Sequence, residues 1–179
     1  MEEKTGIIIK STGSWHIVRD DQGNDYHCRI KGKFRVQGIR STNPVAVGDK
    51  VDFKVSGTKE GIIFDIHDRK NYIIRKSINL SRKGHIIAAN VDQAFLMVTL
   101  AKPKTYPAFI DRFLASAEAY RIPARLVFNK IDIYQEEENL MLKEYQSIYE
   151  KIGYPCYTIS ATQGINLESL KKDMTGKSM

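Results

Sequence analysis

The chain has 179 residues and a formal net charge of +7, with 42% hydrophobic and 27% charged residues. This composition is ordinary for a globular protein, with enough apolar residues for one good core or two small ones. It excludes a membrane-spanning helix, because no apolar run is long enough, and no apolar signal region follows Met1. The two cysteines, Cys28 and Cys156, lie far apart, so we expect reduced thiols in a cytoplasmic protein.

The positive charge is confined to the N-terminal half. Residues 1–85 contain 17 Lys and Arg against 10 Asp and Glu, whereas the rest of the chain contains 11 of each kind. One-sided charge of this kind favours attraction to the phosphate backbone of a nucleic acid. The alternative is a basic face that is merely solvated.

Residues 1–75 contain short runs of alternating or β-branched residues, several of them separated by glycine-containing turns. Short strands at close spacing indicate a closed barrel, and we predict an all-β OB-fold, which binds oligonucleotides along its second and third strands. We expect Trp15, Tyr26 and Phe53 to lie in the barrel core. The six runs are Thr5–Lys10, Trp15–Arg19, Tyr26–Ile30, Lys50–Val55, Ile62–His67 and Tyr72–Arg75.

The densest basic segment follows the third of these runs and is too irregular for a continuous strand. It suits a loop that binds RNA, because Lys and Arg bind phosphates while Phe34, or Tyr26 nearby, can stack on a base. The candidate RNA-binding residues are Arg29, Lys31, Lys33, Phe34, Arg35 and Arg40.

Residues 76–90 are interpreted as a connector, and residues 91–179 are predicted to form a partial α/β domain of βαβαβα order. The continuous apolar run Gln93–Leu100 is typical of a strand covered on both faces. Two helices with apolar stripes are expected to pack on the sheet. The first stripe is Ile110, Phe113, Leu114 and Ala117, and the second is Leu140, Met141, Tyr145, Ile148, Tyr149 and Ile152.

The segment Asn129-Lys130-Ile131-Asp132 follows the strand-like run 124–128 and precedes a helical segment. Loops at the carboxyl ends of parallel strands are where α/β sheets bind ligands. The Asp132 carboxylate can accept hydrogen bonds from guanine N1–H and the exocyclic amino group, which adenine cannot offer. Asn129 can donate to guanine O6 or N7, or brace the neighbouring backbone, and the stem of Lys130 can lie over the base.

A second short run, 156–159, is followed by Ser160-Ala161-Thr162. We expect the backbone N–H of Ala161 to be free to donate to guanine O6, and Ser160 to hold the loop and buttress Asp132. Together the two segments predict a guanine site made by Asn129, Lys130, Ile131, Asp132, Ser160 and Ala161. The alternative is an ordinary strand-end turn followed by a helix cap.

A phosphate-binding loop of the form G-x-x-x-x-G-K-[ST] is missing, because Gly32-Lys33 precedes Phe34, and Gly176-Lys177-Ser178 has Lys171 in place of the first glycine. We assign no D-x-x-G switch, because neither stretch with that spacing, 20–23 or 173–176, follows a phosphate-binding loop. No grouping of catalytic nucleophile and base and no zinc-ligand spacing of His and Cys occurs. We therefore assign no catalytic and no metal-binding residue. Either the guanine motif is spurious, or the motif order is permuted and the chain stops before the phosphate-binding part.

The segments 75–82, 88–93, 110–113, 129–132 and 160–161, behind a basic β-rich part, resemble the ribosome small-subunit-dependent GTPase A family. The resemblance implies an OB-fold, a circularly permuted GTPase domain in which the base-reading motifs precede the P-loop, and a zinc domain beyond it. It implies GTP with Mg²⁺ as ligand, and the small ribosomal subunit and its rRNA as partners, without membrane or DNA. Residues 170–177 look like the stretch just before the family's P-loop.

Two functions follow from these observations. In the first, the chain is the front part of a GTPase for late assembly of the small ribosomal subunit. In the alternative, it is a non-catalytic OB-fold module that binds RNA and at most weakly binds guanine nucleotides. For the 179 residues alone we expect no hydrolysis, because the groups that stabilise phosphoryl transfer are absent from the sequence.

Overall fold

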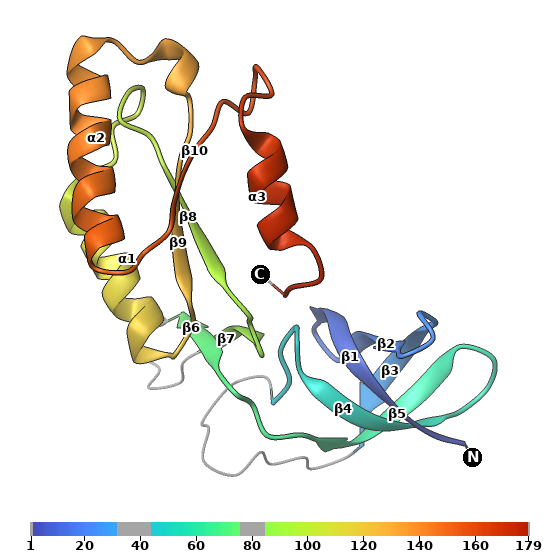
Figure 1. The fold of residues 1–179 in the computed structure, drawn as a ribbon. Helices are drawn as coiled ribbons and strands as arrows, with labels where there is room; N and C mark the ends of the chain where they lie inside the picture. Colours follow the sequence, from blue (N-terminus) through green and yellow to red (C-terminus); the bar gives the residue numbers. More distant parts are fainter. Residues whose placement is uncertain (1, 32–43, 76–84, 179) are drawn as a thin grey trace. The chain divides into compact units, whose positions relative to one another are not determined.

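The computed structural model describes residues 2–31, 44–75 and 85–178, and it divides into two compact units, Met1–Asn90 and Val91–Met179. The expected RNA-binding residues Lys33, Phe34, Arg35 and Arg40 lie outside the described residues. Figure 1 shows the helices and strands of both units, coloured from the N-terminus to the C-terminus.

The first unit contains a closed five-stranded barrel in the order β1-β2-β3-β5-β4. Strands β3 and β5 are parallel, and the other neighbouring pairs of the barrel, including the closing pair of β1 and β4, are antiparallel. Residues in these strands alternate between core and exterior, as a barrel with a filled interior requires. The strands are β1 (Glu3–Thr12), β2 (Trp15–Asp20), β3 (Asp25–Ile30), β4 (Lys50–Val55) and β5 (Glu60–Ile66).

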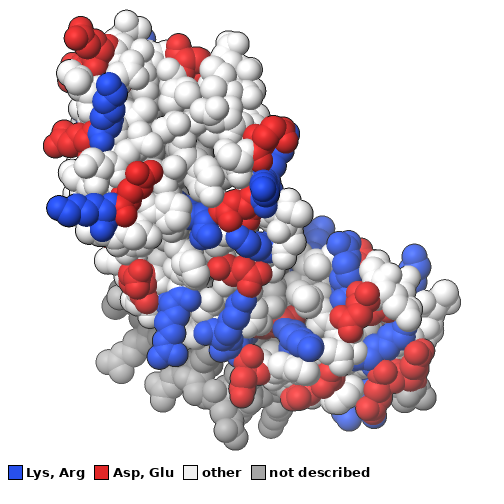
Figure 2. All heavy atoms as spheres, viewed as in Figure 1, with Lys and Arg blue, Asp and Glu red and all other residues white. Residues whose placement is uncertain are grey.

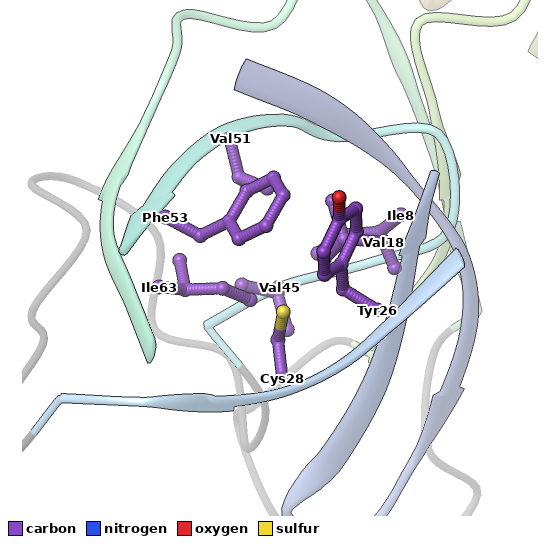
Figure 3. Close-up of a cluster of buried hydrophobic side chains, with 8 residues drawn as sticks. All are labelled: Ile8, Val18, Tyr26, Cys28, Val45, Val51, Phe53 and Ile63. Atoms are coloured by element: carbon purple, nitrogen blue, oxygen red, sulfur yellow. The ribbon is translucent and has the colours of Figure 1, made fainter. Parts of the chain in front are cut away.

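The barrel interior is a single cluster of buried side chains (Figure 3). Tyr26 and Phe53 pack with ring centroids 5.1 Å apart, which confirms that both belong to the core. Gly61 permits this packing, because a Cβ there would lie 2.8 Å from the sulfur of Cys28. The cluster is Ile8, Val18, Tyr26, Cys28, Val45, Val51, Phe53 and Ile63.

Trp15 is not in this core. Trp15 is the first residue of β2, and its side chain lies on the outer face of the barrel. The residue is 41% exposed. The prediction of a core tryptophan was therefore wrong, because the alternation of β2 places His16 and Val18 inside and Trp15 outside.

The sixth expected strand lies outside the barrel. β6 (Tyr72–Arg75) pairs antiparallel with β7 (His85–Ala89) in a separate two-stranded sheet, so part of the expected connector is also a strand. A bridge between Val47 and Ala88 joins this sheet to the loop that precedes β4. Gly48 in that loop has φ +90°, and any side chain there would collide with the carbonyl oxygen of Ala89.

The second unit is built on a parallel sheet in the order β10-β9-β8, as the βαβαβα pattern predicted. Helices α1 and α2 lie on one side of this sheet and α3 on the other (Figure 1). No helix in the described ranges is both long enough and apolar enough to cross a bilayer. The elements are β8 (Ala94–Val98), α1 (Pro107–Ala119), β9 (Ala124–Phe128), α2 (Glu136–Lys151), β10 (Cys156–Thr158) and α3 (Leu167–Met174).

The stripe expected on α1 is largely buried, with only Phe113 partly exposed. The stripe expected on α2 was wrong for three positions, because Leu140, Ile148 and Ile152 are exposed. Leu142 and Tyr149 are the buried residues of this helix. A capping box formed by the side chains of residues 135 and 138 fixes where α2 begins, directly after the candidate site.

Candidate guanine-binding site

The three parallel strands end at one level. In the register of the sheet, Phe128 of β9 lies opposite both Val98 of β8 and Thr158 of β10. The loops that follow these strands therefore emerge at the same edge, where α/β sheets bind their ligands. Two of these loops carry the two expected halves of the guanine motif.

Asn129 holds the two halves together. Its side-chain oxygen accepts hydrogen bonds from the backbone N–H of Lys130 at 2.8 Å and from that of Ala161 at 3.0 Å. The structure thus confirms that Asn129 braces the neighbouring backbone. The Ala161 N–H, which was expected to be free, is engaged, so that prediction was wrong for this structure. Within the described residues, the side-chain N–H₂ of Asn129 has no hydrogen-bond partner.

Lys130 is fixed at both ends. Its backbone adopts a left-handed conformation with φ +70°, and its Nζ donates to the carbonyl oxygen of Lys102 at 2.6 Å. Its aliphatic stem therefore spans from one strand-end loop to another. The residue types at 101–104 do not indicate this contact. The carbonyl in question is a backbone group that no residue type reveals.

Asp132 lies in the short 3₁₀ turn Ile131–Ile133 (η1), and its carboxylate is exposed. It has no hydrogen-bond or ion-pair partner in the described part of the chain. Ile131 is half-buried beside it. The structure therefore presents a carboxylate whose oxygens remain available as acceptors at the edge of the sheet.

Ser160 is fully buried, and its hydroxyl serves its own loop rather than Asp132. Its Oγ accepts from the Gln163 N–H at 3.1 Å and lies 3.2 Å from the Thr162 hydroxyl. Its backbone exchanges two hydrogen bonds with Ile165. Ser160 thus holds the loop, as expected, but the expected support of Asp132 was wrong.

Tyr134 is a residue of this site that the sequence analysis missed. It is buried, and its hydroxyl donates to the carbonyl oxygen of Asn129 at 2.7 Å and accepts from the Leu100 N–H at 3.0 Å. Burial raises the pKa of this phenol, so it remains a neutral donor and acceptor. Tyr134 therefore joins the end of β8 to the loop after β9. Nothing in the sequence distinguishes this tyrosine from one that only fills the core.

On the barrel, Arg29 and Lys31 are the expected RNA-binding residues that the structure describes, and both are exposed. Tyr26 is buried against Phe53, so the prediction that it could stack on a base was wrong. The visible face in Figure 2 carries basic and acidic side chains interspersed on both units. Much of the basic excess lies outside the described residues, in Lys33, Arg35, Arg40, Lys76, Arg82 and Lys83.

Asp52, Asp65 and His67 come within 4.8 Å of one another on β4, on β5 and just beyond it. Asp52 is already engaged, because it accepts from the Thr5 hydroxyl at 2.6 Å and lies 3.0 Å from His67 Nε2. The hydrogen bond from Thr5, followed by that from His67, lowers the pKa of Asp52. These contacts account for the cluster, and we assign it no metal ion.

The chain matches the family models described as RsgA N-terminal domain, over residues 5–63, and RsgA GTPase, over residues 66–179. The "Small ribosomal subunit biogenesis GTPase RsgA 2" of Bacteroides thetaiotaomicron is 54% identical over 172 residues, covering 96% of this chain and 56% of that protein. The "Small ribosomal subunit biogenesis GTPase RsgA" of Flavobacterium psychrophilum is 53% identical over 179 residues, covering 97% of this chain and 54% of that protein.

Two solved structures share the fold. YjeQ from Thermotoga maritima matches with a TM-score of 0.80 and 32% identity, and YloQ, described as a circularly permuted GTPase, with 0.76 and 28%. Each match covers 98% of this chain and 58% of the other. The fold class predicted from the sequence, an OB-type barrel followed by part of an α/β GTPase domain, is confirmed. The chain spans a little more than half the length of the proteins that it matches.

Proposed function

This chain belongs to the RsgA GTPase family, and on that premise we propose that it carries the guanine-reading and RNA-binding parts of a GTPase for small ribosomal subunit biogenesis. The base-reading part lies in residues 91–179, and the RNA-binding part is the barrel within residues 1–75, with residues 76–90 between them. The partners are the small ribosomal subunit with its rRNA and a guanine nucleotide.

The observation that carries the proposal is the pairing of the two strand-end loops around Asn129. With Ala161 and Lys130 tied to the Asn129 oxygen, the side-chain N–H₂ of Asn129 remains available to donate to guanine O6 or N7. The unpartnered Asp132 carboxylate accepts from guanine N1–H and N2–H₂. The stem of Lys130, held by Lys102, covers one face of the base. Adenine cannot satisfy this carboxylate, since it lacks both donors.

The family implies GTP with Mg²⁺, but the side chains described here fit only the base. The printed sequence contains no G-x-x-x-x-G-K-[ST] motif, so no residue of it is assigned to Mg²⁺ or to the γ-phosphate. We therefore derive no hydrolytic step from this chain, and we assign it no zinc ligand. The proposed contribution of these residues is to select and orient the base.

The proposal is tested by calorimetric titration of the chain with GTP, GDP, ATP and XTP in the presence of Mg²⁺. We expect binding of GTP and GDP and none of ATP. An Asp132→Asn change should lower GTP affinity and raise XTP affinity, because the asparagine amide donates to the C2 carbonyl that xanthine has in place of the amino group. Glu137→Gln, which alters another exposed carboxylate, should leave both affinities unchanged.

Equal affinity for GTP and ATP, or an Asp132→Asn variant that binds GTP as the parent does, would overturn the base-reading role. The chain would then be better described by the alternative, a non-catalytic RNA-binding barrel. An RNA titration of the same protein measures RNA binding independently of base reading, so the two functions are tested separately.

A further inference from the structure

On the outer face of the barrel, the side chain of Arg29 lies over the indole ring of Trp15, with Cζ 3.7 Å from the ring centroid. Trp15 belongs to β2 and Arg29 to the neighbouring strand β3. Trp15 as a whole residue is 41% exposed. A tryptophan is large enough that exposure on a strand leaves a substantial apolar surface in water, and such a residue is a candidate for contact with a ligand.

The guanidinium of Arg29 is unusual among the described arginines of this unit. Arg19 forms two hydrogen bonds with Asp25, and Arg69 forms two with Asp49. In the described ranges, Arg29 has neither a carboxylate nor a hydrogen-bond acceptor as partner. The ring therefore holds the guanidinium in place while its N–H donors remain available.

Further exposed groups continue this surface. Lys31 lies two residues beyond Arg29, just after β3, and is exposed. Ile62 of β5 lies opposite Arg29 in the register and is 39% exposed. Lys54, opposite Ile62, is paired with Glu3 at 2.8 Å and is therefore not counted among the available cations. The surface formed by Trp15, Arg29 and Lys31 thus combines one exposed aromatic ring with two cations that have no acidic partner among the described residues.

We propose that Trp15 and Arg29 form a stacking platform for one unpaired base of single-stranded RNA, with Arg29 and Lys31 binding the adjoining phosphates. The inference rests on the RNA-binding function proposed above for the barrel and assigns the residues that perform it. Every base presents a π face to an indole, and a guanidinium binds phosphate through two parallel hydrogen bonds. Because a base within a duplex is already stacked on its neighbours, the platform selects unpaired RNA.

The test uses the fact that Trp15 is the single tryptophan of the chain. A fluorescein-labelled single-stranded RNA of 12 nucleotides, rich in adenine, is titrated with the protein, and anisotropy reports binding. In a parallel titration with unlabelled RNA, tryptophan emission reports stacking. We expect the emission to be quenched by the single strand and to be unchanged by a duplex of the same length.

Trp15→Ala should weaken binding of the single strand roughly 5- to 100-fold without changing the salt dependence, because stacking adds no charge. Trp15→Phe keeps an aromatic face and remains informative if Trp15→Ala does not fold. It should retain most of the affinity for the single strand. Arg29→Gln should weaken binding and reduce the salt slope by about one. Ile7→Ala, at an exposed position of β1, is the control for loss of apolar surface and should have no effect.

Three results would overturn the platform, and they are distinguishable. If anisotropy reports binding while the emission and the Trp15→Ala affinity do not change, the barrel binds RNA elsewhere and only the platform is wrong. If anisotropy reports no binding to any RNA, the proposed RNA-binding function fails and the platform fails with it. Loss of thermal stability in Trp15→Ala with unchanged RNA affinity would show that the pair is only a packing contact.

Discussion

The side-chain oxygen of Asn129 and the backbone N–H of Ala161 lie 3.0 Å apart and join two loops that are separated by 32 residues in sequence. The residue that begins the first loop therefore also positions the second. In the proposed base-reading site, Asn129 therefore has two tasks, since its oxygen holds the backbone while its N–H₂ remains for the ligand. The two tasks can be separated by substitution.

Replacing Asn129 with Asp should lower guanine nucleotide affinity with little loss of stability. The aspartate keeps an oxygen to accept from Lys130 and Ala161, but it has no N–H₂ group and places a negative charge beside guanine O6. Asn129→Ala removes the oxygen as well, and each lost hydrogen bond costs about 1 kcal/mol. Calorimetry with GDP and thermal unfolding should show weaker binding in both variants and a lower Tm mainly in Asn129→Ala. Unchanged GDP affinity in Asn129→Ala would contradict this assignment.

Tyr134→Phe should weaken guanine nucleotide binding although the residue is not expected to touch the base. The change leaves the Leu100 N–H and the Asn129 carbonyl without their shared partner, at a cost of about 1–3 kcal/mol because Leu100 and Tyr134 are buried. Part of this cost appears in the stability of the second unit, and part as a loosened loop that binds GDP less tightly.

The matched control for Tyr134→Phe is Tyr154→Phe. The hydroxyl of Tyr154 donates to the exposed carboxylate of Glu118 at 3.2 Å, where water can replace it, so this variant should lose less than about 0.5 kcal/mol. Urea unfolding and GDP titration of both variants provide the comparison. Equal effects of the two changes on GDP affinity would show that Tyr134 does not position the loop.

The sequence was sufficient to place the two loops proposed to read the base directly after buried strands, because residue type and strand position both depend on local pattern. It could not show how the loops are joined. The Asn129 contact to Ala161 and the Lys130 contact to Lys102 involve backbone groups far away in the chain, and a backbone group has no sequence signature. The role of Tyr134 was hidden for the same reason.

The barrel, too, could be predicted from the sequence only in part. Residue type predicted that Trp15, Tyr26 and Phe53 lie in the core, and this was right for Tyr26 and Phe53. It was wrong for Trp15, because residue type does not show which face of β2 a side chain occupies. The run at Tyr72–Arg75 has the residue types of a barrel strand. It pairs instead with His85–Ala89, because the barrel already closes through β1 and β4. Closure of a barrel depends on the whole set of strands and cannot be seen in any one of them.

Arg69→Ala should destabilise the first unit strongly. The guanidinium of Arg69 binds both oxygens of Asp49 at 2.6 Å and also donates to the Pro44 carbonyl, while Asp49 is fully buried. Removing the arginine leaves a buried carboxylate without its cation, which costs about 3–5 kcal/mol. Urea unfolding followed by far-ultraviolet circular dichroism measures the loss.

Arg19→Ala is the control for Arg69→Ala, because Arg19 forms a similar two-point pair with Asp25 on the exposed surface. An exposed pair contributes at most about 1 kcal/mol, so this variant should unfold near the urea concentration of the parent. If both variants lose the same stability, burial of the Asp49 carboxylate is not what makes its pairing important.

The stability of the barrel should fall as the pH is lowered from 7.5 to 5.5, because of His16. This side chain is buried, its Nδ1 lies 3.1 Å from the Ser11 hydroxyl, and its Nε2 has no hydrogen-bond partner among the residues that the structure describes. Burial lowers its pKa below the ordinary value of 6.5. The unfolded chain therefore takes up a proton near pH 6.5 while the folded chain does not, so the contribution of neutral His16 is complete above that pH and decreases below it.

The decrease can reach about 1.4 kcal/mol for each pH unit below 6.5, down to the pKa of His16 in the folded state. Urea midpoints at pH 7.5, 6.5 and 5.5 measure it.

His16→Phe keeps a ring in the core but cannot be protonated, so its stability should vary less over this range, even if it is lower at every pH. His27→Gln removes an exposed histidine of β3 and should leave the pH dependence of the parent intact. The carboxylate of Asp52 does not interfere, because the hydrogen bond from Thr5 keeps its pKa below this range. A pH dependence that persists unchanged in His16→Phe would assign the effect to another group.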